Sequence, residues 1–268
     1  MNINCCLVHQ RHFLNCLYRT KNRTTKNKER SWKVVNKLVL KLLLVVVVVF
    51  FGLWKLSSSV SFQLFGELID KVDTEQKLVA LTFDDGPTPH YTADILQLLD
   101  LYQVKATFFV TGTETQRYMT QAKQIVAAGH QLGNHSWSHQ RMIFMSLDEI
   151  QREIEGTDQQ IREAGYQGEI LFRPPYGKKL VLLPWYLANS NRTNIMWDIA
   201  PETFGEDSED PQAMATEVLE QVEPGSIVLL HLMYKNREAS RAALPLILKG
   251  LKDKGYRMVT LSELLAAQ

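Results

Sequence analysis

The run Leu78-Val79-Ala80-Leu81-Thr82-Phe83-Asp84-Asp85-Gly86-Pro87 joins a short apolar segment to an acidic turn. Residues 79–83 have the composition of a β-strand, and Gly86 and Pro87 favour a turn directly after it. From this point to the end of the chain, short β-type runs alternate with longer amphipathic segments. That alternation is typical of βα units, so we predict an α/β fold with a parallel sheet.

Working outward from residue 78, we expect strands at residues 79–83, 106–110, 131–134, 169–172, 194–197, 226–230 and 257–260. About seven strands suggest a (β/α) barrel, which need not be complete. Apolar residues recur at three- and four-residue spacing between the strands, which predicts helices at 92–101, 115–128, 147–164, 211–222 and 239–254. Gly129, Gly165 and Gly255 lie where helix C-caps are expected.

The beginning of the chain differs in charge from the rest. Residues 1–41 hold ten Lys and Arg and one acid, Glu29. The chain has 30 basic and 29 acidic residues, so 20 basic and 28 acidic residues follow Lys41, a formal charge of −8. An apolar run at 42–54 follows the basic arm directly, so we expect the arm to act next to a membrane rather than to bind nucleic acid.

The apolar segment, taken as residues 42–56, has two interpretations. Its unbroken apolar run of thirteen residues is short for a spanning helix, which needs roughly 20, and it also fits a signal-peptide core. A start at Leu38, with Lys41 reaching the headgroups, lengthens the span to seventeen residues. We favour an uncleaved anchor because the basic region is long for a signal, although Ser57 and Ser59 leave cleavage open.

For an uncleaved anchor, the positive-inside rule predicts that residues 1–41 form a cytoplasmic arm. The domain at 78–268 would then lie outside the cytoplasm, in the periplasm or at the cell surface, after a linker or stalk at 57–77. All three cysteines lie in the arm, which agrees with export, and a metal site in the domain must therefore use His and carboxylate ligands.

Polar clusters follow four of the expected strands, where a (β/α) barrel carries its catalytic residues. Asp84 and Asp85 follow the first strand. Adjacent carboxylates repel, and the pair is tolerable if a cation binds one while the other accepts a proton. On this motif alone, a solvated turn is an equally good interpretation.

The second cluster is His135-Ser136-Trp137-Ser138-His139. If this stretch is helical, both imidazoles lie on one face. Two histidines and one carboxylate form a common divalent-metal triad, although such pairs also occur by chance on helix faces.

The third and fourth clusters present single charged groups. In Arg173-Pro174-Pro175-Tyr176-Gly177, two prolines hold the backbone so that the guanidinium can pair with a carboxylate and a backbone N–H can face an oxyanion. A stiff surface turn is the alternative. His231 ends an apolar strand and is a candidate general acid, although a single His is more often structural.

In order and spacing, these clusters resemble the motifs of the polysaccharide deacetylase family, also called the NodB homology domain or carbohydrate esterase family 4. The resemblance spans roughly residues 79–265. It implies a distorted (β/α) barrel in which Asp85, His135 and His139 bind a divalent metal, usually Zn and alternatively Co, Mn or Ni. It also implies that Asp84 is the catalytic base and His231 the acid, and that the chain is a metal-dependent hydrolase.

The resemblance assigns the remaining site residues as well. Arg173 would orient Asp84, and the Tyr176 backbone N–H would hold the oxyanion. The family's fourth motif, Asp-x-x-Asp-Trp, is altered here: Ala200 and Thr203 align with the aspartates, and Phe204 aligns with the substrate-binding Trp. The tether of His231 is therefore open. Asp198 or Glu202 are candidates to replace it, His231 held in another way is a further alternative, and the change equally fits a subfamily with a different substrate.

The substrate implied by the resemblance is an N-acetylated polysaccharide of the peptidoglycan or chitin type. Two alternatives stay open. The same metal site can hydrolyse O-acetyl groups on glycans, and the altered fourth motif also fits a catalytically weak, glycan-binding envelope protein.

Overall fold

The computed structural model describes residue 32 and residues 36–202 and 209–268. The chain divides into two compact units, residues 1–54 and 55–268, and each is considered by itself. In the described part of the chain, one helix, Asn36–Ser57, has the length and composition to cross a membrane, with 22 residues and a mean hydropathy of 2.5. It is longer than the expected segment at 42–56. A membrane anchor and a signal sequence both fit these properties.

Strand β2, Leu78–Asp84, is the centre of the sheet, and all seven of its residues are buried. It pairs in parallel with β3 (Thr107–Val110), β6 (Ile227–His231) and β7 (Arg257–Val259). Strand β4, Gln131–Asn134, pairs in parallel with the other edge of β3. The expected parallel sheet is confirmed, and the ends of β2, β4 and β6 lie at one edge of it.

Beyond β4, single bridges continue the sheet. Phe172 bridges Asn134 at the end of β4 and Asn194 at the start of β5 (Asn194–Ile195). Strand β5 also pairs in parallel with β1, Leu68–Ile69. The expected strand at 169–172 is thus reduced to one bridging residue, because the two prolines that follow have no N–H to continue a ladder.

One further bridge, between Ile199 and Val228 of β6, closes the ring. The path therefore runs from β2 through β3, β4, Phe172 and β5 back to β6 and β2. This is a distorted (β/α) barrel with seven named strands, as expected from the sequence.

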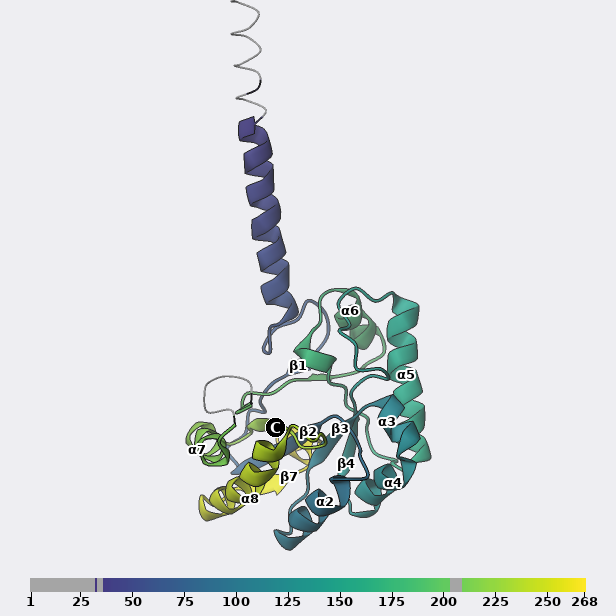
Figure 1. The fold of residues 1–268 in the computed structure, drawn as a ribbon, viewed down its shortest axis with the longest axis vertical. Coiled ribbons are helices and arrows are strands. Elements are labelled where there is room, and N and C mark those ends of the chain that lie inside the picture. The colour runs from purple at the N-terminus through teal and green to yellow at the C-terminus, as the bar shows by residue number, and fades with distance from the viewer. Residues whose placement is uncertain (1–31, 33–35, 203–208) are drawn as a thin grey trace, which may run out of the picture. The chain divides into compact units, whose positions relative to one another are not determined.

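Helices lie around the strands (Figure 1). Their bounds are α2 Thr92–Leu101, α3 Gly112–Arg117, α4 Met119–Ala127, α5 Leu147–Glu163, α6 Leu182–Asn189, α7 Pro211–Gln221, α8 Glu238–Asp253 and α9 Leu261–Leu265, with a 3-10 turn at Pro175–Gly177. The expected helix at 115–128 is two helices, because Tyr118 leaves helical geometry between them. Helices α6 and α9 are short, and sequence periodicity did not indicate them.

The alternation of side chains along β2 positions the site. Val79, Leu81 and Phe83 belong to the large core that includes residues of the outer helices. Ala80 points the other way, into the smaller core inside the barrel. Because side chains alternate along a strand, Thr82 and Asp84 also face the interior. A strand that is apolar at its start therefore delivers a carboxylate to the mouth of the barrel at its end.

The segment expected as a linker at 57–77 packs against the domain in part. It contributes β1, and Val72 is buried. Gly225 holds a positive φ of 85°, and a Cβ there would lie 1.8 Å from the Val72 carbonyl oxygen. Glycine is required at this close approach.

Candidate metal centre and catalytic site

Arg173 lies inside the barrel and holds Asp84. The guanidinium is fully buried, and its Nη1 donates to Asp84 Oδ1 at 2.7 Å and to Thr82 Oγ1 at 2.8 Å. Its other nitrogens donate to the carbonyl oxygens of Ile195 and Met196. Every nitrogen of this buried cation therefore has an acceptor, which makes its burial tolerable.

The ring of Phe109 lies 4.2 Å from the Arg173 guanidinium carbon, and the Trp197 ring lies at 5.5 Å. Burial by itself raises the pKa of Asp84, but the charges of Arg173, His135 and His231 lower it by more, so the net pKa lies below its usual value. Asp84 is therefore a carboxylate at neutral pH.

Asp85 follows in a turn that residues of α3 stabilise. Asp85 and Gly86 both have a φ of 75°, which turns the chain sharply at the end of β2. Glu114 accepts a hydrogen bond from the Gly86 N–H at 2.8 Å and bonds Thr111 Oγ1 and Tyr234. We did not single out Glu114 from the sequence, although Thr111 and Glu114 have the spacing of a helix capping box.

The second cluster is a loop, so a helical geometry for residues 135–139 is wrong. Ser136 and His139 have φ values of 65° and 57°, outside the range of a right-handed helix. The imidazoles still converge, with ring centroids 5.0 Å apart. The His135 Nδ1 pairs with the Arg173 carbonyl at 2.8 Å, which leaves its Nε2 facing the aspartates.

Asp85, His135 and His139 fit a divalent metal. One ligand atom from each lies within 4.8 Å of the others, and Asp85 Oδ1 is 3.3 Å from His139 Nε2. Asp85 Oδ1 is buried without a hydrogen-bond partner, and burial raises the pKa of this carboxyl group. Burial also lowers the pKa of both histidines, which favours the neutral imidazole that binds metals. A cation would satisfy the unpaired oxygen.

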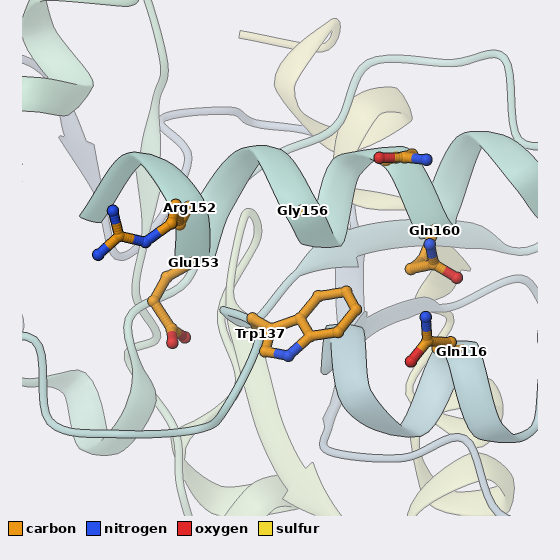
Figure 2. Close-up of a pocket in the computed structure, with 7 residues that line it drawn as sticks. Gln116, Trp137, Arg152, Glu153, Gly156 and Gln160 are labelled. Carbon is orange, nitrogen blue, oxygen red and sulfur yellow. The ribbon is translucent and has the colours of Figure 1, made fainter. Parts of the chain in front are cut away.

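Trp137 fixes the loop that carries the two histidines. Figure 2 shows its indole between α5, which carries Gly156, and the helix that carries Gln116. A Cβ on Gly112 would lie 2.4 Å from the indole, and one on Gly156 would lie 3.2 Å from it. Glycines at these two positions therefore make room for the ring.

Glu153 of α5 holds the same loop by hydrogen bonds. Its two carboxylate oxygens accept from the N–H and the hydroxyl of Ser138 at 2.8 and 2.7 Å. The His139 N–H donates to Ser136 Oγ at 3.1 Å. The position of His139 thus depends on α5, which we did not anticipate from the sequence.

His231 ends β6, directly beside Asp84 in the register of the sheet. Its Nδ1 is 2.6 Å from Glu202 Oε2, and its backbone N–H donates to Glu202 Oε1 at 2.8 Å. Asp198 instead accepts from Ser226 and from the Ile227 N–H. Of the two candidate replacements for the missing tether, the structure therefore selects Glu202.

Tyr176 lies beside the metal ligands. Its ring is half-exposed and packs on His139, with centroids 4.8 Å apart, and the Arg141 guanidinium carbon lies 4.2 Å from it on an exposed edge of the site. A φ of 58° places Tyr176 in the left-handed region, which residues other than glycine rarely adopt, within the turn from Pro174 to Gly177. Phe204 lies outside the described residues, so its expected role in substrate binding stays a prediction.

A pocket of about 400 Å³ brings these groups together. Its lining includes Asp84, Asp85, His135, His139, Tyr176, Trp197, Glu202, His231 and Arg237. Arg173 lies beneath the pocket, against Asp84. The predicted catalytic and metal-binding residues that the structure describes therefore lie together, with the candidate tether Glu202 and with Arg237, which the sequence did not indicate.

The family model described as polysaccharide deacetylase matches residues 71–194. The peptidoglycan-N-acetylglucosamine deacetylase of Bacillus cereus is 34% identical over 195 residues, which cover 73% of this chain and 91% of that protein. The chain belongs to the polysaccharide deacetylase family. It is accordingly a deacetylase of the hydrolase class.

Two further relatives show the range of the family. The peptidoglycan-N-acetylmuramic acid deacetylase PdaC of Bacillus subtilis is 35% identical over 73% of this chain, and the match spans only 40% of that relative. Its solved structure has a TM-score of 0.63 at 36% identity and covers 73% of this chain and 93% of the solved one. A pseudoenzyme of carbohydrate esterase family 4 from Bacillus anthracis has a TM-score of 0.67 at 29% identity, covering 76% and 70% of the two chains.

Proposed function

We propose that this chain removes the acetyl group from acetamido sugars of peptidoglycan, and that the reaction needs a divalent metal, preferably zinc. Because the family includes a pseudoenzyme, the fold alone does not carry this proposal. The observation that supports it is the arrangement of two charge pairs, Asp84 with Arg173 and His231 with Glu202, around the Asp85, His135 and His139 donor set.

The roles follow from the environment of each group. Asp85, His135 and His139 would hold the ion, which when bound polarises the acetyl carbonyl and activates water. Asp84 has a lowered pKa and is ionised, so it can take a proton from the attacking water. Arg173 keeps this carboxylate charged and fixes its orientation.

His231 would donate a proton, whereas Asp84 accepts one. Burial lowers its pKa, but the hydrogen bond to Glu202 and the nearby carboxylates raise the pKa by more, so the imidazolium form persists to higher pH. A protonated His231 can donate to the departing amine, which is a poor leaving group when unprotonated. The Tyr176 backbone N–H would stabilise the oxyanion, and Phe204 would contact the sugar.

We also propose that residues 36–57 anchor the protein in the membrane and that the catalytic domain acts outside the cytoplasm. The basic arm before the helix supports this orientation. The names of the relatives from Bacillus cereus and Bacillus subtilis support peptidoglycan as the polymer.

The test is acetate release by the full-length chain in detergent, with N-acetylglucosamine oligomers, peptidoglycan glycan strands and O-acetylated xylan as parallel substrates. We expect release from the N-acetylated glycans, loss of activity after chelation and its return with added zinc. Release from acetylated xylan alone would identify an O-acetyl esterase. Binding without release from any substrate would identify a glycan-binding protein.

A further inference from the structure

Arg237 lies in the catalytic pocket but takes no part in the chemistry proposed above. It is the N-cap residue of α8, a few residues after His231, and it lines the same pocket as Asp84 and Asp85. Its side chain is 35% exposed, so a substrate in the pocket can reach the guanidinium.

The hydrogen-bonding groups of Arg237 are largely unused within residues 36–202 and 209–268. Its Nε is buried and has no hydrogen-bond partner. Its Nη1 forms an ion pair with Glu202 Oε2 at 3.6 Å, a separation that is too long for a hydrogen bond. Both oxygens of Glu202 already accept hydrogen bonds from His231. A buried donor without an acceptor is unfavourable, so the guanidinium gains if its side chain turns toward a ligand that supplies one.

Arg241, one helical turn later, shows the contrast. Its Nη1 donates to the carbonyl oxygens of Leu232 and Tyr234, and its guanidinium carbon lies 3.8 Å from the Tyr91 ring. Arg241 therefore holds the loop after β6 in place. Arg237 makes no comparable backbone contact in the described part of the chain.

The charges around the pocket also favour a ligand with a hydrogen-bond acceptor. Asp84 is paired with Arg173, and Glu202 Oε2 is shared between His231 at 2.6 Å and Arg237 at 3.6 Å. Asp85 is the carboxylate of the metal set. Among the described residues that line the pocket, Arg237 is thus a cation whose one ion pair, with Glu202, is too long for a hydrogen bond and is shared with His231. A planar guanidinium with free donors matches a carboxylate in two-point contact.

We propose that Arg237 is a specificity-determining residue that binds a carboxylate of the substrate close to the acetamido group under attack. This inference rests on the proposed deacetylase function and narrows its substrate. In N-acetylmuramic acid, a lactyl carboxylate is attached through C3, next to the C2 carbon that bears the acetamido group. A plain N-acetylglucosamine polymer has no carboxylate. The preferred substrate is therefore a muramic acid residue that carries no stem peptide, because a stem peptide is joined to the lactyl carboxylate as an amide and removes its charge.

The test compares wild type and Arg237→Gln in the full-length protein with zinc, on three substrates. They are a chitin oligomer, a peptide-free glycan strand with free lactyl carboxylates, and the same strand with those carboxylates converted to methyl esters. We expect wild type to prefer the free carboxylate. Arg237→Gln should lower kcat/KM on that strand by roughly 10- to 100-fold, mainly through KM, and change the other two little.

Lys235→Gln is the matched control, because it removes an exposed positive charge from the same loop outside the pocket. Its kinetics should equal those of wild type. A glycan strand that carries acidic peptides is a fourth substrate. If wild type prefers it over the peptide-free strand, the bound carboxylate belongs to the peptide, and the assignment to the lactyl group is overturned.

Two other results would overturn the inference while leaving the proposed function intact. One is equal wild-type activity on the chitin oligomer and on the free-carboxylate strand. The other is an equal loss on all substrates in Arg237→Gln with a shifted pH profile, which would show that Arg237 only positions Glu202 and His231. No acetate release from any substrate by wild type would instead contradict the proposed function itself.

Discussion

Glu202 binds His231 through both oxygens of its carboxylate. Oε1 accepts from the His231 backbone N–H at 2.8 Å, and Oε2 lies 2.6 Å from the His231 Nδ1. The backbone contact fixes the position of the strand end, and the ring contact fixes the imidazole and its charge. One side chain thus makes the contact to His231 that the altered fourth motif leaves open, in which Ala200 and Thr203 align with the family's two aspartates.

Glu202→Gln should therefore change the pH dependence of catalysis. The pKa of His231 lies above its ordinary value, and loss of the Glu202 charge lowers it. Because the general acid must be protonated, the alkaline limb of kcat/KM should move to lower pH, and kcat should fall roughly tenfold or more. The measurement is a pH–rate profile of both proteins, with Glu209→Gln, an exposed glutamate, as control.

The same pair has a signature in stability. A histidine whose pKa is raised on folding stabilises the native state below its unfolded pKa, and this contribution disappears as the pH rises through the folded pKa. The difference in unfolding free energy between wild type and Glu202→Gln should thus be largest at acidic pH and shrink at alkaline pH. A difference that does not depend on pH would show that Glu202 does not govern the charge of His231.

Sequence reasoning located the candidate site because the motifs follow strand ends, and parallel strands bring those ends to one edge. Asp84 and His231 illustrate this, since they are register partners in β2 and β6. Glu202 was one of two candidates, because spacing alone could not show whether it or Asp198 reaches the ring. The roles of Glu114, Glu153 and Arg237 depend on tertiary contacts, which no local pattern reveals.

Glu153→Ala should weaken metal binding although Glu153 touches no metal ligand directly. Its carboxylate holds Ser138, the residue before His139, by two hydrogen bonds. Loss of residues that support metal ligands costs about 10- to 100-fold in affinity, so we expect a rise of that size in the zinc Kd. A competition titration with a zinc chelator measures it.

The control for this variant is Glu163→Ala, an exposed glutamate near the end of the same helix. It should leave the zinc Kd unchanged. If both variants bind zinc like wild type, the loop is held by the packing of Trp137 and by the N–H groups of Gly112 and Thr113, which donate to the carbonyls of Ser136 and Trp137, rather than by Glu153.

A reporter fused after Gln268 should be active only outside the cytoplasm. The reason is the excess of Lys and Arg before the helix Asn36–Ser57, which keeps the preceding arm inside. Paired periplasmic and cytoplasmic reporters measure the orientation, and the size of the membrane-bound product distinguishes an anchor from a cleaved signal. Activity of the cytoplasmic reporter would reverse the topology.

The fold was predictable where the hydrophobic pattern of the sequence is strong. It was less predictable where contacts between distant segments determine the secondary structure. The apolar run of β2 and the periodicity of α5 gave the correct element with bounds within one or two residues. The strand expected at 169–172 is only a bridge at Phe172, because the prolines after Arg173 end the ladder. The small strand β1 has no periodic signal, and its pairing with β5 arises from packing in three dimensions.

Asp84→Asn and Asp85→Asn should have different consequences, although the residues are neighbours. Asp85 offers a buried, unpaired oxygen to the metal, so Asp85→Asn should weaken zinc binding. Asp84 is bound by Arg173, so Asp84→Asn should retain the metal but lower kcat roughly 10²-fold or more with little change in KM. Zinc content and steady-state kinetics of the two variants test this difference.

Stability should separate the same two variants in the absence of metal. Asp84→Asn leaves the buried Arg173 cation without its counter-charge, which costs about 3–5 kcal/mol for a buried pair. Asp85→Asn removes a buried carboxylate that has no hydrogen-bond partner on Oδ1, so the metal-free protein should unfold at the same or a higher temperature. Thermal unfolding with a chelator present measures both. Equal Tm values, equal zinc content and equal small losses of rate would show that the two aspartates form an ordinary acidic turn, and the roles proposed for them would be wrong.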